Sequence, residues 1–137
     1  MLRIPHDQLE WRTDDLYYAQ GKPFSGIGYG FAPDGWLLYE IEYRDGIQCG
    51  TAREWGGPEQ LVAERSYGWA WLHGPTRVWH DNGKLAEESG YEMGFCLVRK
   101  KWDDQGRLIE DYALQPTDAE YRLLEQKRKE RSPDMTR

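Results

Sequence analysis

The sequence predicts an all-β protein, a repetitive, single-layer, twisted antiparallel meander of about eight short strands with a capping helix at its C-terminal end. Three observations support this prediction. One pattern of residues recurs about every 24 positions, each copy holds two alternating segments joined by turn residues, and the period stops before a helix-start signal. Since the chain carries 7 Trp and 9 Tyr among 137 residues, we expect a thin core built mostly from rings.

The first part of the chain differs from the repeat that follows it. Residues 1–25 show only fragments of the period, although they are rich in large side chains: Trp11, Leu16, Tyr17, Tyr18 and Phe24. We interpret them as an N-terminal cap and degenerate half-repeat that covers the first edge of the sheet.

Residues 26–115 hold four copies of the repeat. An aromatic residue marks each copy, at Phe31, Trp55, Trp79 and Trp102, with spacings of 24, 24 and 23. These aromatic positions are predicted to be core. Turn pairs such as Asp34-Gly35 and Asn82-Gly83 separate the two strands of a copy, and Gly56-Gly57-Pro58 is expected to replace the pair in the second copy, where Glu59 stands for glycine. Alternation over 37–43 predicts a strand with two unlike faces.

Residues 116–137 are predicted to form a C-terminal helix and a tail, within what is one domain in all. Thr117 as N-cap and Glu120 three residues later match a capping box, which predicts a helix at about 118–131. Cations crowd its last turns, where they favour the helix dipole. We expect this helix to cap the open edge of the sheet and residues 132–137 to fray.

Charge and hydropathy exclude several classes of function. The chain has 24 acidic and 18 basic residues, a net charge of -6, which argues against direct binding to nucleic acid or anionic membranes and suits a basic partner. The longest apolar run, 69–72, is far shorter than a membrane span of about 20 residues. With no secretory signal pattern and two cysteines expected to be reduced, the sequence predicts a cytoplasmic protein.

No motif of catalysis or cofactor binding is found in the sequence, so we expect neither an enzyme nor a bound cofactor. His80-Asp81 falls at a predicted turn and is interpreted as solvated. Cys49, His73 and Cys96 hold nearly equivalent places in successive repeats. Because one repeat advances about 10 Å across a sheet, they are expected to lie too far apart for a shared metal or a disulfide.

Two charged columns run through the repeats. An acid recurs at Glu40, Glu64, Glu88 and Asp111, and a cation stands eleven residues before three of them, at Arg53, Arg77 and Lys100. One interpretation is a cross-strand ion pair in each repeat, which contributes about 0.2–1 kcal/mol. The other is a negative surface that meets a partner.

Some aromatic residues break the pattern, because most of the equivalent positions in the other repeats are polar. Rings of this kind are frequent hot spots of protein interfaces, although they could instead pack on the terminal segments. Together with the acidic column they form the predicted partner-binding set: Trp36, Trp69, Tyr39, Tyr29, Glu40, Glu64 and Glu88.

The columns Gly50-Arg53-Trp55, Gly74-Arg77-Trp79 and Tyr91–Gly94 resemble the MORN-variant repeat. Over about residues 17–114 the chain resembles the small bacterial YwqK-like antitoxins. That resemblance implies a non-enzymatic, sheet-built protein that neutralises a cognate toxin, and the acidic charge suggests a basic toxin such as a nuclease or deaminase. The alternative is a MORN-type scaffold or lipid-surface module.

Overall fold

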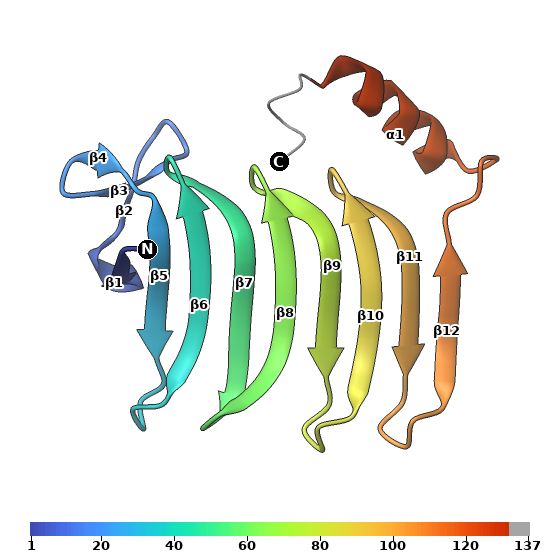
Figure 1. The fold of residues 1–137 in the computed structure, drawn as a ribbon, viewed down its shortest axis with the longest axis horizontal. Helices are drawn as coiled ribbons and strands as arrows, with labels where there is room; N and C mark the ends of the chain where they lie inside the picture. The colour runs from blue at the N-terminus through green and yellow to red at the C-terminus, as the bar shows by residue number, and fades with distance from the viewer. Residues whose placement is uncertain (132–137) are drawn as a thin grey trace.

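The structure, a computed structural model, describes residues 1–131 as a nine-stranded sheet, a small three-stranded sheet and one α-helix (Figure 1). The strands of the large sheet, in spatial order, are β1 (Arg3–Pro5), β5 (Gly26–Phe31), β6 (Leu37–Arg44), β7 (Ile47–Gly57), β8 (Gln60–Gly68), β9 (Trp71–Trp79), β10 (Leu85–Glu92), β11 (Phe95–Trp102) and β12 (Leu108–Ala113).

Strands β5 to β12 follow one another in space as they do in sequence, and each pairs antiparallel with the next. This long, curved meander confirms the predicted fold class (Figure 1). Tight turns of one kind join β6 to β7, β8 to β9 and β10 to β11. Both residues of each such turn have positive φ, which matches the twist of paired strands: Asp45-Gly46, Trp69-Ala70 and Met93-Gly94.

The turn of the second repeat differs from the expected one. Gly56 and Gly57 belong to β7, and the turn itself is Pro58-Glu59. Glu59 takes the left-handed conformation, with φ 58°, that glycine takes in the other repeats. The two-residue loop fixes this geometry, so the side chain is tolerated at a small conformational cost.

The N-terminal segment folds over the first edge of the large sheet. Its β1 pairs with β5 in parallel, a short 3-10 helix η1 (His6–Gln8) follows, and β2 (Glu10–Trp11), β3 (Tyr17–Ala19) and β4 (Lys22–Pro23) form the small sheet. Phe24 and Tyr43 are buried here, with ring centroids 5.8 Å apart, and Tyr17 lies 5.0 Å from Tyr43. The largest cluster of contacting rings therefore lies at this end.

The repeat aromatics are less buried than predicted. Phe31 is 58% exposed, and Trp55, Trp79 and Trp102 are only half-buried. The prediction that this column is core is therefore wrong for Phe31. A single-layer sheet has no second layer to cover the rings that lie near its strand ends. The buried apolar residues are Phe24, Ala32, Tyr43, Cys49, Ala63, Met93 and Leu124.

The C-terminal helix α1 (Ala119–Glu130) is present as predicted, but its cap and its position differ from expectation. Asp118 is the N-cap instead of Thr117, and its carboxylate accepts the backbone N–H of Gln115 at 2.8 Å, so no capping box forms. The helix lies across the ends of the last strands and does not run along the edge of β12 (Figure 1). The predicted fraying of 132–137 lies outside the described residues.

Two contacts hold α1 against the sheet. Leu124 is fully buried, and the Arg128 guanidinium donates two hydrogen bonds of 2.7 Å to Glu92 at the end of β10. Over residues 1–131, no helix is both long and apolar enough to cross a membrane.

Candidate interaction surface

One face of the sheet carries a single line of alternating charges from β6 to β12, called here the charge row. Because directly opposed residues of neighbouring strands point to the same face, the register places all of them side by side. In order across the strands the charge row is Glu40, Arg53, Glu64, Arg77, Glu88, Lys100 and Asp111.

The cross-strand ion pair predicted from the eleven-residue spacing forms in two of the repeats. The Arg53 Nε lies 2.8 Å from Glu64 Oε2, and the Arg77 Nε lies 3.1 Å from Glu88 Oε2. Both pairs are partly exposed, so each contributes about 0.2–1 kcal/mol. These acids sit beside cations and add little net negative charge to the face.

The first end of the charge row is completed by the N-terminal segment. Arg3, on β1, donates a hydrogen bond to the Glu40 carboxylate and stands 5.0 Å above the ring of Tyr29. Tyr29 lies opposite Glu40 and packs edge-on against Phe31 at 5.5 Å. This off-pattern tyrosine therefore contacts a terminal segment, which is the alternative that the sequence left open.

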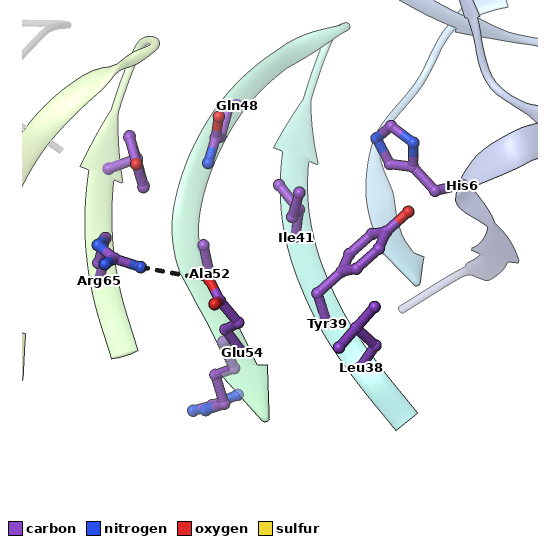
Figure 2. A pocket seen from close by; sticks show the side chains of 10 residues that line it. His6, Leu38, Tyr39, Ile41, Gln48, Ala52, Glu54 and Arg65 are labelled. Atoms are coloured by element: carbon purple, nitrogen blue, oxygen red, sulfur yellow. Dashed lines mark ion pairs between the residues drawn. The ribbon is translucent and has the colours of Figure 1, made fainter. Parts of the chain in front are cut away.

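The opposite face of the sheet is hollowed over β6, β7 and β8 (Figure 2). This groove, called here the Tyr39 groove, has a volume of about 390 Å³. The small side chain of Ala52 leaves room at its centre, and an ion pair of 3.7 Å between Arg65 and Glu54 lies beside it. The lining residues are His6, Leu38, Tyr39, Ile41, Gln48, Ala52, Arg53, Glu54, Arg65 and Tyr67.

At one end of the Tyr39 groove, His6 packs among tyrosine side chains. His6 Nε2 and the Tyr43 hydroxyl share a hydrogen bond of 2.9 Å, and the ring of His6 meets that of Tyr39 edge-on at 5.7 Å. Burial lowers the pKa of His6, partly opposed by Asp7. Burial also raises the pKa of the Tyr43 hydroxyl, so both groups stay neutral at pH 7.

The two off-pattern tryptophans lie far from each other. Trp36 is in the turn between β5 and β6, and Trp69 is in the turn between β8 and β9. These turns are at opposite ends of the strands (Figure 1). The predicted partner-binding set is therefore divided: Tyr39 lines the groove on one face, Tyr29, Glu40, Glu64 and Glu88 lie on the other face, and the tryptophans occupy the two rims.

Sequence reasoning missed three residues that shape these surfaces. Arg3 and His6 belong to the non-repeating segment, where no other copy of the repeat offers a comparison. Arg65 could have been found, because the equivalent positions in neighbouring repeats are Ile41 and Ser89, which makes an arginine unusual there.

The described residues hold no assembled metal site. Within 1–131, no three His, Cys, Asp or Glu side chains gather closely enough to bind a metal ion. Cys49 is buried and Cys96 half-buried, and both are free thiols.

Comparison with known proteins gives one informative similarity. Over 108 residues the chain is 29% identical to immunity protein YwqK of Bacillus subtilis (strain 168). The aligned region covers 79% of this chain and 70% of that protein. No protein family profile matches the chain. No solved structure is significantly similar to it. The comparison supports the resemblance to YwqK-like immunity proteins that the repeat pattern indicates.

Proposed function

We propose that this chain is a non-enzymatic immunity protein that binds and neutralises a basic bacterial toxin. The observation that carries this proposal is the similarity to immunity protein YwqK, which extends over most of the sheet. The net charge of -6 suits a basic partner, since the summed field of a protein speeds its encounter with an opposite charge. A toxin that acts on nucleic acid, such as a nuclease or deaminase, would carry such a basic surface.

The proposed interface uses the sheet and its rims. Tyr39 offers a ring at the border of a groove, and Glu54 beside it is well exposed. Trp36 and Trp69 are half-buried at the two rims, and aromatic side chains in such positions often anchor a partner. The paired acids of the charge row contribute to this surface mainly through its pattern of alternating charge.

The test is co-expression with the product of the neighbouring gene in the source genome. We expect the neighbour alone to stop growth of the host, and the pair to grow and to co-elute on a sizing column. An unrelated acidic protein expressed at the same level serves as the control. A harmless neighbour, or toxicity that persists while this chain is expressed and folded, would contradict the proposal.

The charge part of the proposal has its own measurement. Between low and high salt the association rate of the purified pair should fall by about tenfold or more, because steering over distances beyond about 10 Å is screened. If the association rate does not change with salt, the partner is not recognised through its basic charge. The proposed immunity role would be unaffected by that result.

A further inference from the structure

The outer edge of β12 is open. This strand pairs with β11 on one side, and no other strand among residues 1–131 pairs with its far side (Figure 1). Leu108 and Ile109 are 51% and 65% exposed, and Val98 on β11 is 51% exposed. Exposed edges with apolar side chains are sites where another strand can add, and proteins usually protect them with charged side chains, lysine above all, or with proline. Strand β12 has no lysine or proline, and its two charged residues, Glu110 and Asp111, are both acidic.

The charge row is incomplete at this edge. From β6 onward, each acid of the row stands between two cations or beside one, and the row ends on an acid, Asp111. Asp111 is exposed and lies opposite Lys100, yet within the described chain it makes no ion pair or side-chain hydrogen bond. The next position in the alternation, on a strand beyond β12, would be a cation.

The protein shows the completed arrangement at its other edge. There β1 adds to the outside of β5, and its Arg3 reaches across Tyr29 to the carboxylate of Glu40, the first acid of the charge row. At this edge, an arginine on an added strand therefore pairs with the first acid of the charge row. At the β12 edge the described chain supplies no such strand.

We propose that the open edge of β12 docks an extended segment of the toxin by strand addition, with a Lys or Arg of that segment placed beside Asp111. This inference rests on the proposed function and adds the β12 edge to the sheet surface and rims proposed there. Backbone hydrogen bonds along the edge would supply affinity, and the charge beside Asp111 would set the register.

Charge argues against a second copy of this chain as the occupant. Suppose that two β12 strands paired antiparallel about their centre. Glu110 of each copy would then lie opposite Asp111 of the other copy. Like charges directly opposed destabilise a strand pair, whereas a basic segment gains at the same positions.

A peptide from the chain itself provides a defined probe. Residues 50–56 belong to β7 and contain Arg53, which lies opposite Glu40 on one neighbouring strand and Glu64 on the other. Added to the full-length protein, this peptide should shift the backbone amide resonances of 108–113. A peptide with Arg53→Glu should bind about two- to tenfold more weakly, and Asp111→Lys in the protein should reverse that preference. Shifts that map elsewhere, or equal affinity of both peptides, would overturn the inference.

The toxin itself provides the second arm. Asp111→Lys should abolish co-elution with the toxin, while Asp81→Lys, the same change of charge in an exposed turn away from β12, should keep it. Circular dichroism confirms that both variants fold. If Asp111→Lys still co-elutes with the toxin and Tyr39→Ala does not, the toxin binds at the Tyr39 groove. If the chain forms a dimer that Asp111→Lys dissociates, the edge of β12 binds a second copy of the chain. Either result refutes toxin docking at this edge. A harmless neighbouring gene product would contradict the proposed function alone, since the peptide still tests the edge.

Discussion

The meander begins with the first strand of a repeat, β5, and ends with the second strand of a repeat, β12, and these two strands have opposite surroundings. At the first edge, β1, η1 and the small sheet cover β5 and β6, and Phe24 and Tyr43 are only 2% and 4% exposed. At the last edge, β12 has no covering strand in the described chain, and Ile109 is 65% exposed. The repeat therefore provides the sheet, while the non-repeating N-terminal segment covers its first edge, where the rings of Phe24 and Tyr43 are buried together.

This difference follows from the single-layer architecture. A strand in the middle of the meander touches only its two neighbours, so most of its side chains stay half-buried, and the buried ones, such as Ala63 and Thr76, are small. The two largest fully buried side chains, Phe24 and Leu124, lie where a terminal segment folds over the sheet, one at each end of the chain. Stability should consequently concentrate at these covered places.

The largest expected effect tests that contrast directly. Phe24→Ala removes a buried ring that packs on Tyr43, and should lower the free energy of unfolding by about 3–5 kcal/mol. Ile109→Ala, the matched truncation at the open edge, should change it by less than about 0.5 kcal/mol. Urea denaturation followed by tryptophan fluorescence measures both. Equal losses would show that the two edges are covered alike in solution.

Much of this arrangement could be predicted from the sequence, because the repeat encodes it locally. The period and the turn pairs gave the order of the strands, and the eleven-residue spacing correctly paired Arg53 with Glu64 and Arg77 with Glu88. Such pairs depend only on hairpin register, which the turns determine.

What could not be predicted depends on how segments fold over the sheet. Phe31 is 58% exposed and Phe24 is buried, since only Phe24 belongs to the N-terminal segment that folds against Tyr43. The Tyr39 groove needs His6 from the same segment. The path of α1 across the strand ends depends on the single contacts of Leu124 and Arg128, which have no repeating signal.

Lowering the pH should destabilise the N-terminal end of the sheet before the C-terminal end. Burial lowers the pKa of His6 from 6.5, so the unfolded chain takes up this proton before the folded chain, and stability falls as pH drops below about 6.5. The hydrogen bonds from Arg128 lower the pKa of Glu92 from 4.5, so the stability from that contact is present above about pH 4.5 and is lost as pH falls further.

Urea denaturation at pH 7.5 and pH 5 gives the measurement. The wild-type protein should lose more stability between the two values than His6→Gln, which keeps a polar group near Tyr43 but does not titrate in this range. If the variant shows the same loss as the wild type, the sensitivity to acid lies in other groups.

The smallest expected effect concerns the charge row between the two edges. A double-mutant cycle on Arg77 and Glu88, with each changed to Met, should give a coupling energy of about 0.2–1 kcal/mol that shrinks in high salt, because the pair is partly exposed. The same cycle on Lys100 and Asp111 serves as the control, since these residues are opposed but form no ion pair within the described chain, and its coupling should be close to zero. On addition of the 50–56 peptide, Asp111 should couple to the added arginine while the Lys100 coupling stays small. A large Lys100–Asp111 coupling in the free protein would mean that the charge row is already complete at its last strand, and the contrast between the two edges would then rest on burial alone.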